Sequence, residues 1–581
     1  MKNLNKIQSW LKTQKIDLFL INRTDEFFGE YIAPYAERLK WISNFSGSAG
    51  RAIILQNKAY IFVDGRYTLQ VKQEVNKKYF KIKDLQDYWL ILKNIIKEVN
   101  LVSLDPSLHS ISEVTTIKKI LGKKNLKFTK KNPIDLFWRN QPAYPKTKAF
   151  IHEKKYAGLS TKNKITKVQS LLRKHSIDYY FFTSLDSIAW LLNIRGNDIK
   201  YTPLTLSYLF LPCNGKAEIF IHQIKVDKIK RNLSKIINFN DFKKIDLYLQ
   251  NLNSKKIIGF DISKTNYSFK IKCENAKLDT YNLQDPCTFL KAQKNSVEIK
   301  GSINANKRDG LSLTKFLYWL KNNMKINKTN ELNASNYLYN LRKKNKLFFS
   351  LSFESISAVG KHAAIPHYRL TKKSNLSFKK DIIYLIDSGV QYLDGTTDIT
   401  RTIIIGKATK EQKDRYTRVL KGHIALARAK FNLDTKGSDL DKLARKSLNE
   451  IGCDYNHGTG HGVGSFSSVH EGPIRIAKKN TSSNNKILEK MIFSNEPGYY
   501  KENQYGIRTE NLVLSYKINN STLGFKTISL APFDNDLIEI GMLNQEEKKW
   551  LNNYHKEVFR NFSNKLNYKQ QIWLKKVTKS I

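Results

Sequence analysis

The sequence is poor in cysteine and has no long hydrophobic run. Its four cysteines are scattered and form no C-x-x-C pair, which argues against a disulfide framework and a structural zinc knuckle. No apolar run approaches the ~18 residues that a membrane-spanning helix needs. The N-terminus also lacks an apolar signal stretch with a small-residue cleavage site. These absences predict reduced thiols and a soluble cytoplasmic protein without a membrane partner.

Acidic residues are also scarce, with 51 Asp and Glu against 100 Lys and Arg and a formal net charge of +49. Such a charge is compatible with nucleic-acid binding. However, the lysines are spread along the whole chain together with abundant asparagine and isoleucine, and all three have A/T-rich codons. Interleaved aromatic residues of the RNA-binding-sheet type are missing. We therefore predict no nucleic-acid partner, and a functional basic surface remains the alternative.

A chain of 581 residues is too long to fold around one hydrophobic core, and a length of about 150 residues per domain suggests three or four domains. The first part alternates helical and strand-like patterns, and a later part repeats that plan at domain scale. The patterns then change to long helices over 297–322, 411–431 and 438–451, with strands at 382–386, 402–405 and 512–515. The predicted fold is a multidomain α/β and α+β chain: 1–135 and 160–292 are related α/β domains separated by a linker at 136–159, 293–530 is an α+β domain, and 531–581 is a C-terminal extension.

Two aspartates are predicted to lie on the arms of one hairpin. Asp387 ends the apolar strand 382–386, and the turn at Asp394-Gly395 allows a second strand to begin near Asp398. Neighbouring carboxylates raise each other's pKa unless a cation neutralises them. Each aspartate alone could be an ordinary solvated turn residue, but further candidate ligands elsewhere in the chain favour a metal.

The further candidates are His461, Glu496 and Glu510. His461 lies in a glycine-rich segment that could cradle a phosphate, but no Gly-Lys-Ser/Thr follows, and a metal ligand is the better interpretation. Glu496 precedes a Pro-Gly turn that would fix its direction. Four carboxylates and one imidazole suit manganese, cobalt or zinc. A metal pair can activate a water and clamp a carbonyl oxygen.

Three more histidines, His367, His457 and His470, exceed the need of such a site for imidazole. Each could be an ordinary polar side chain. A hydrolase that cleaves a bond to nitrogen, however, needs a proton donor and a group that stabilises the oxyanion. Histidine suits both tasks near pH 7.

These segments resemble the pita-bread metallopeptidases, and above all the three-domain Xaa-Pro aminopeptidases (aminopeptidase P). The resemblance covers nearly the whole chain, including 30–34, 45–50 and 64–67 in the first domain and 531–566 in the tail. It implies two creatinase-like N-terminal domains before a pita-bread catalytic domain. The motifs that carry it lie at 387–398, 457–464, 470–473, 496–500 and 506–511.

The resemblance implies a role for each candidate residue. One metal would be held by Asp387, Asp398 and Glu510, and the other by Asp398, His461, Glu496 and Glu510. Glu496 would also act as base, His470 would stabilise the oxyanion, and His367 would assist proton transfer. The substrate-binding residues would be Arg66, His367, His457, His470 and Arg508. One departure from the family pattern is the segment Gly360–Ala364, which carries an extra histidine, His362.

The function implied is a metal-dependent exopeptidase. It would release the N-terminal residue of peptides with proline second, by attack of a metal-bridging hydroxide on the Xaa-Pro bond. The expected cofactors are two divalent ions per subunit, Mn²⁺ with Zn²⁺ or Co²⁺ as alternatives, in a homodimer. A prolidase that cleaves Xaa-Pro dipeptides and a non-catalytic pita-bread binding module are the alternative functions.

Overall fold

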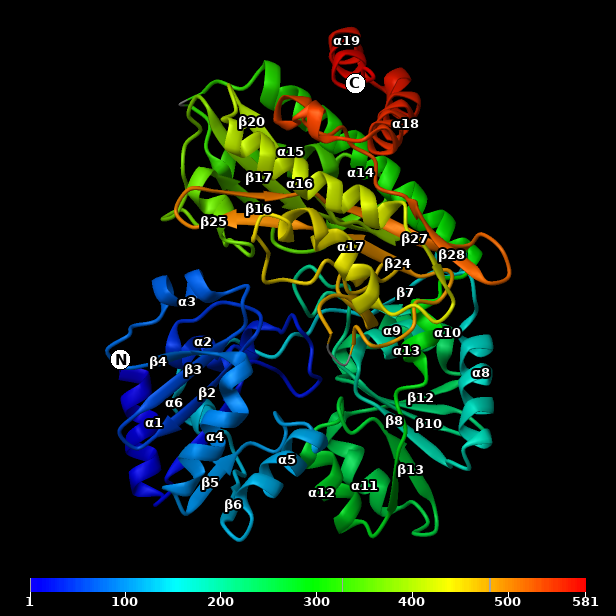
Figure 1. Ribbon diagram of the computed structural model, residues 1–581. Coiled ribbons are helices and arrows are strands. Elements are labelled where there is room, and N and C mark those ends of the chain that lie inside the picture. The colour runs from blue at the N-terminus through cyan, green and yellow to red at the C-terminus, as the bar shows by residue number, and fades with distance from the viewer. Residues whose placement is uncertain (1, 327, 480–481) are drawn as a thin grey trace. The chain divides into compact units, whose positions relative to one another are not determined.

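The computed structural model describes residues 2–326, 328–479 and 482–581 (Figure 1). The chain forms two compact units, one of residues 1–153 and 159–288 and one of residues 154–158 and 289–581. No helix in the described part of the chain combines the length and the apolar character needed to cross a membrane.

The first unit contains two six-stranded sheets with the same strand order. Along each sheet the successive strand pairs are parallel, antiparallel, antiparallel, parallel and parallel, so the predicted duplication is confirmed. The first sheet has the order β4 (Lys81–Asp84), β3 (Ala59–Val63), β2 (Gly50–Leu55), β1 (Leu18–Asn22), β5 (Leu101–Leu104) and β6 (Asn125–Phe128). The second has the order β12 (Ile237–Asn240), β11 (Ala217–Phe220), β10 (Tyr208–Pro212), β8 (Tyr179–Phe182), β13 (Ile257–Phe260) and β14 (Asp279–Asn282).

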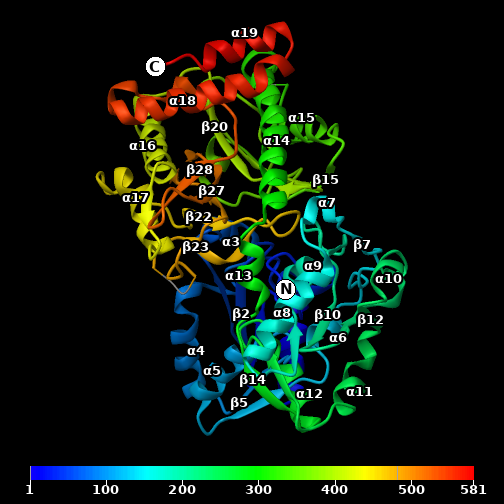
Figure 2. The same cartoon turned by 90° about the vertical axis from the view of Figure 1, so that its right-hand side faces the viewer.

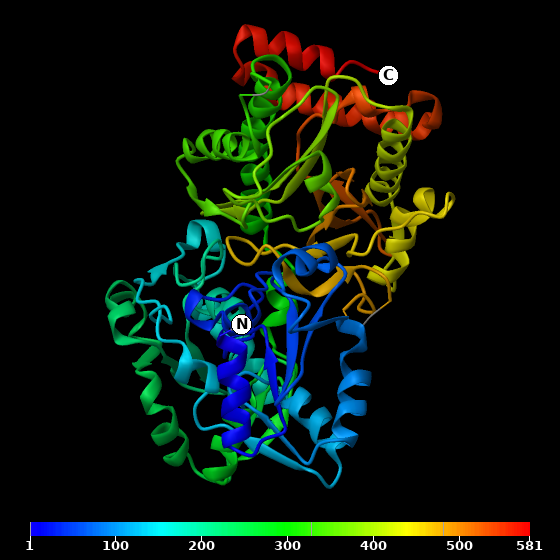
Figure 3. The ribbon, with the colours of Figure 1, turned by 90° about the vertical axis from the view of Figure 1, so that its left-hand side faces the viewer.

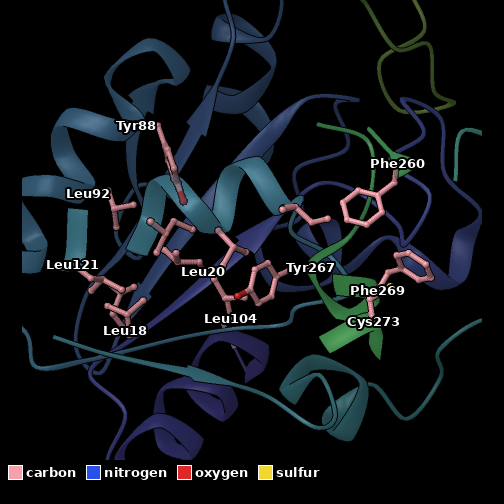
Figure 4. Close-up of a cluster of buried hydrophobic side chains, with 14 of the residues drawn as sticks. Leu18, Leu20, Tyr88, Leu92, Leu104, Leu121, Phe260, Tyr267, Phe269 and Cys273 are labelled. Atoms are coloured by element: carbon pink, nitrogen blue, oxygen red, sulfur yellow. The ribbon is translucent and has the colours of Figure 1, made fainter. Parts of the chain in front are cut away.

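One apolar cluster joins the two domains of this unit (Figure 4). Tyr267 lies beside Leu104 of the first sheet, and Phe269 stacks on Phe181 of the second with ring centroids 3.6 Å apart. The helices of the unit are α1 (Lys2–Thr13), α2 (Arg38–Ser43), α3 (Thr68–Glu74), α4 (Tyr88–Lys97), α5 (Ile111–Leu121), α6 (Pro133–Phe137), α8 (Thr161–Lys174), α9 (Leu185–Leu192), α10 (Asp227–Leu233), α11 (Ile245–Gln250) and α12 (Tyr267–Asn275), with short strands β7 (Phe150–Ile151) and β9 (Ile194–Arg195).

The second unit is an α+β structure whose strands carry the candidate site. Its sheets have the orders β15-β18-β19, β16-β17-β20 and β21-β28-β27-β24-β22-β23, with β25 paired to β26. The strands are β15 (Phe348–Leu351), β16 (Ile356–Val359), β17 (Ile382–Ser388), β18 (Val390–Tyr392), β19 (Gly395–Thr396), β20 (Ile399–Ile405), β21 (Lys430–Asn432), β22 (Gly460–Gly462), β23 (Glu471–Ile476), β24 (Ile492–Asn495), β25 (Gly498–Lys501), β26 (Tyr505–Arg508), β27 (Asn511–Lys517) and β28 (Thr522–Thr527).

The helices of the second unit include two from the C-terminal region. α18 packs on α16 and α19 packs on α14, as the red helices in Figures 2 and 3 show. The helices are α7 (Lys154–Ala157), α13 (Cys287–Ala292), α14 (Ser296–Asn322), α15 (Glu331–Lys343), α16 (Lys410–Ala427), α17 (Gly437–Asn449), α18 (Gln545–Phe562) and α19 (Tyr568–Val577).

The predicted helix over 411–431 is wrong at its C-terminal end. α16 stops at Ala427, and Phe431 lies in β21, opposite Leu523 of β28. This strand pairing joins residues about ninety positions apart, so the local helical pattern could not reveal it.

Candidate metal centre

The first two candidate ligands are delivered by adjacent antiparallel strands. β17 and β20 pair with Asp387 opposite Thr400, and Asp398 lies immediately before β20. The connection between the two arms is more elaborate than a single turn, because β18 and β19 form a hairpin of their own around Asp394. The arms thus bring both aspartates to one end of the β16-β17-β20 sheet.

The other candidate ligands come from three strands of the six-stranded sheet and its margins. Glu496 follows β24 and Glu510 precedes β27, and these strands pair with Asn495 opposite Asn511. The Nε2 atom of His461, on β22, lies 3.4 Å from Glu496 Oε1.

Three of the five predicted ligands lie close together. Ligand atoms of Asp398, His461 and Glu510 all lie within 4.8 Å of one another, and the three residues are buried. His461 Nε2 lies 3.5 Å from Asp398 Oδ2. Residues spread over more than a hundred positions of the chain therefore form one cluster.

The chemistry of this cluster fits a divalent cation. His461 Nδ1 lies 2.9 Å from the Gly462 carbonyl oxygen, which can only accept, so Nδ1 carries a proton and Nε2, which faces the carboxylates, is the nitrogen that would bind a metal. Within the described residues, Asp387 Oδ1 and Asp398 Oδ1 are buried without a hydrogen-bond partner. Burial and the neighbouring carboxylates raise the pKa of Asp398 and Glu510 well above the usual values. A bound cation would satisfy the orphaned oxygens and offset this repulsion.

A chain of hydrogen bonds links Asp387 to His457. Arg508 Nη2 donates to Asp387 Oδ2 at 2.6 Å, and Arg508 Nη1 donates to the Tyr500 hydroxyl at 2.6 Å. That hydroxyl lies 2.8 Å from His457 Nε2, while His457 Nδ1 lies 2.9 Å from the Gly458 carbonyl oxygen. Since the carbonyl takes the Nδ1 proton, Tyr500 donates to Nε2. The structure therefore brings Arg508 and His457, both predicted site residues, to the carboxylate cluster.

Tyr500 and Thr400 were not predicted as site residues. The Thr400 hydroxyl donates to Glu510 Oε2 at 2.7 Å and lies 3.3 Å from Arg508 Nε. One signal could have indicated Thr400, because it lies two positions after Asp398 and side chains alternate along a strand. Tyr500 was part of a recognised motif, but its partner became evident only from the pairing of β25 with β26, which places Gly498 opposite Arg508.

His470 lies beside the imidazole of the cluster. Its ring centroid is 4.3 Å from that of His461, in an edge-to-face arrangement. The next residue, Glu471, is buried and hydrogen-bonded to the buried Lys294, with Lys291 Nζ 3.4 Å from its other oxygen. This buried charge cluster, which the sequence did not indicate, anchors the start of β23 next to His470.

The atypical loop before His367 is held by Glu331 of α15. This fully buried carboxylate accepts from the Val359 amide at 2.8 Å, and its Oε1 lies 2.8 Å from His362 Nδ1. His362 also stacks on Tyr368 at 4.4 Å, and the Tyr368 hydroxyl donates to the other oxygen of Glu331. The side chain of His362 therefore contacts Glu331 and Tyr368. The half-buried His367 follows the 3-10 turn Gly360–Ala364.

Arg66 lies in the first unit, and its role at the site remains a prediction. Its guanidinium forms a bidentate contact with Asp64, the closest distance being 2.7 Å, and lies 3.4 Å from Glu30 Oε1.

The chain matches known families over almost its whole length. Residues 302–516 match the model of metallopeptidase family M24, and 521–581 match the C-terminal region of these peptidases. Residues 3–134 and 140–298 each match the creatinase/prolidase N-terminal domain.

Individual relatives agree with these matches. The chain is 34% identical to a probable Xaa-Pro aminopeptidase P of Paracoccidioides brasiliensis, over 100% of this chain and 99% of the relative. It is similar to the crystal structure of X-prolyl aminopeptidase from Caenorhabditis elegans, described as a cytosolic enzyme with a di-nuclear active site, with 30% identity, a TM-score of 0.93 and coverage of 100% and 99%. The prolidase from Pyrococcus horikoshii, at 22% identity and a TM-score of 0.52, shares the fold but covers 64% of this chain and 99% of its own. The chain therefore belongs to the Xaa-Pro aminopeptidases of metallopeptidase family M24.

Proposed function

We propose that this protein releases the N-terminal amino acid from peptides whose second residue is proline, in a metal-dependent hydrolysis. The observation that carries the proposal is the buried cluster of Asp398, His461 and Glu510, with Glu496 and Asp387 beside it. Full-length similarity to Xaa-Pro aminopeptidases supports the substrate class.

Two divalent ions fit the donor set. Asp387, Asp398 and Glu510 would hold one, and His461 and Glu496 would complete the shell of the other together with Asp398 and Glu510. Such a pair supplies an activated water and polarises the carbonyl of the scissile bond. Mn²⁺ is the proposed ion because carboxylates dominate the donor set, and the single imidazole also suits Zn²⁺ or Co²⁺.

The side chains around the cluster have separate roles in the proposed hydrolysis. Glu496 takes the proton of the attacking water, because its carboxylate lies at the cluster with Oε1 3.4 Å from His461 Nε2. His470 donates to the developing oxyanion. His367 delivers a proton to the prolyl nitrogen and lines the proline pocket with His457, and Arg66 contacts the substrate. Arg508 keeps the Asp387 carboxylate oriented through the bond at 2.6 Å.

The test compares two substrates with the Mn²⁺-loaded full-length protein. A tripeptide with proline second should lose its first residue, whereas a free Xaa-Pro dipeptide should be a much poorer substrate. Cleavage of the dipeptide without cleavage of the tripeptide would establish the prolidase function instead. Mass spectrometry of the products identifies the bond that is cut.

The proposed domain boundaries are 1–135, 160–292, 293–530 and 531–581, with the linker at 136–159, and the family-model matches support this division. We also propose a cytoplasmic location, supported by the description of the C. elegans relative as cytosolic. The family resemblance further supports a homodimer, which light scattering of the purified protein tests.

A further inference from the structure

Arg401 is a buried arginine that hydrogen-bonds the ligand-bearing backbone, and within the described ranges of the chain its hydrogen-bond acceptors are neutral oxygens rather than carboxylates. It lies three residues after Asp398, in β20, and is 1% exposed. Its Nη1 donates to the carbonyl oxygens of Thr400 at 2.8 Å and Glu510 at 2.7 Å, and its Nη2 donates to Asn511 Oδ1 at 2.9 Å. A buried cation surrounded by neutral acceptors is tolerated only when nearly all its donors are satisfied.

The C-terminal region supplies the remaining acceptors. Arg401 Nη2 donates to the Ala531 carbonyl oxygen and to the Tyr554 hydroxyl, both at 2.8 Å, and Nε donates to the Pro532 carbonyl oxygen at 3.2 Å. The Tyr554 hydroxyl also accepts from the Ala531 amide at 3.0 Å. The ring of Phe533 covers the guanidinium, with 4.5 Å from Cζ to the ring centroid. The region after β28 therefore forms one wall around this arginine.

The same network reaches β24, the strand that Glu496 directly follows. The side-chain Nδ2 atom of Asn511 lies 3.1 Å from His423 Nε2, and His423 Nδ1 lies 3.0 Å from the backbone carbonyl oxygen of Asn495. Burial lowers the pKa of His423 to about 3, so the ring is neutral, with its proton on Nδ1. Because Asn495 precedes Glu496 and Asn511 follows Glu510, the bonds connect the backbone on either side of the site.

We propose that Tyr554 is a positioning residue of the metal centre, acting through Arg401 on the backbone of Glu510. The C-terminal region is then a part of the metal site and not only a packing element. The inference rests on the proposed function, because it requires a metal at this cluster. A hydroxyl that fixes the guanidinium keeps Glu510 and Asp398 at the separation that the ligands need.

The test measures Mn²⁺ affinity by calorimetry on the metal-free, full-length protein. Tyr554→Phe keeps the ring, which stacks on Trp550 with an interplanar angle of 6°, and removes only the hydroxyl. We expect the dissociation constant for Mn²⁺ to rise about 10- to 100-fold. At saturating Mn²⁺ the KM for a proline-second tripeptide should be unchanged, because Tyr554 does not contact substrate.

Two control variants in the C-terminal helices separate positioning from stability. Phe562→Leu removes packing from a fully buried side chain of α18 and should lower the melting temperature without changing Mn²⁺ affinity. Tyr568→Phe alters a tyrosine that is 75% exposed and should change neither quantity.

The outcomes are distinguishable. Unchanged Mn²⁺ affinity in Tyr554→Phe, or equal weakening in Tyr554→Phe and Phe562→Leu, would overturn the inference while leaving the proposed function intact. A wild-type protein that binds no Mn²⁺ would overturn the proposed function itself.

Discussion

Replacing Arg342 by methionine should lower the stability of the second unit, which carries the candidate metal centre, far more than the loss of one surface charge would. Arg342 of α15 is fully buried and donates to Asp309 of α14 at 2.6 and 2.9 Å. It also lies 3.3 Å from the Ser388 carbonyl oxygen, next to Asp387, while Thr397, next to Asp398, donates to the same Asp309 at 2.8 Å. One ion pair thus contacts a neighbour of each candidate aspartate, Ser388 beside Asp387 and Thr397 beside Asp398.

The magnitude follows from the burial of the carboxylate that is left behind. In Arg342→Met, the partner left to Asp309 among the residues that the structure describes is the Thr397 hydroxyl, while the carboxylate remains out of water. Removing one partner of a buried pair costs about 3–5 kcal/mol. The double variant Asp309→Leu/Arg342→Met leaves no buried charge behind, so it should recover part of that loss.

Hydrogen exchange is the suitable assay, because a chain with several domains does not unfold in one two-state step. Peptides from β17 and β20 should exchange on the order of 100- to 4,000-fold faster in Arg342→Met, at about 1.4 kcal/mol per tenfold change. Lys486→Met removes a half-exposed cation from an exposed pair and should leave these peptides unchanged. A loss below about 1 kcal/mol in Arg342→Met would refute the reasoning, since only surface ion pairs are that weak.

Three further predictions concern the surroundings of the site. Tyr500→Phe should lower kcat/KM about 10- to 100-fold because it uncouples Arg508 from His457, whereas the neighbouring Tyr499→Phe should have little effect in the same assay. Glu331→Gln should raise the KM for proline-second peptides about tenfold, because this carboxylate holds the loop that leads to His367; an unchanged KM would argue against that role. Burial lowers the pKa of His555 to about 3 in the folded protein. As pH falls below about 6.5, the unfolded chain therefore binds a proton at this histidine while the folded chain does not, and the free energy of unfolding decreases. Between pH 6.5 and 5, hydrogen exchange should show wild type losing about 2 kcal/mol more than His555→Gln; parallel pH profiles would contradict this.

The sequence was sufficient to predict the fold class, the duplication and the hairpin arms. These features depend on local periodicity and on the repeated plan in which strand 177–182 mirrors strand 16–20. The candidate ligands could be selected because carboxylates and a histidine in glycine- and proline-marked turns form an unusual set. Their clustering within 4.8 Å is a tertiary fact that no local pattern contains.

The supporting residues were beyond the reach of sequence patterns. Every residue of β20 is buried, so alternation between polar and apolar positions gives no indication that Arg401 points toward the C-terminal region. Its partner Tyr554 is 153 positions away and lies on an ordinary amphipathic helix. Likewise, Glu331 lies on a helix with no motif, and only the folded chain shows that it holds the loop before His367.

The most direct test of the proposed function combines metal analysis with kinetics on one protein sample. The chelator-treated protein should be inactive, and adding Mn²⁺ should restore release of the first residue from a proline-second tripeptide as two ions bind per chain. Asp398→Ala should lose metal and activity together. Turnover by the metal-free protein, or full activity in Asp398→Ala, would contradict the account.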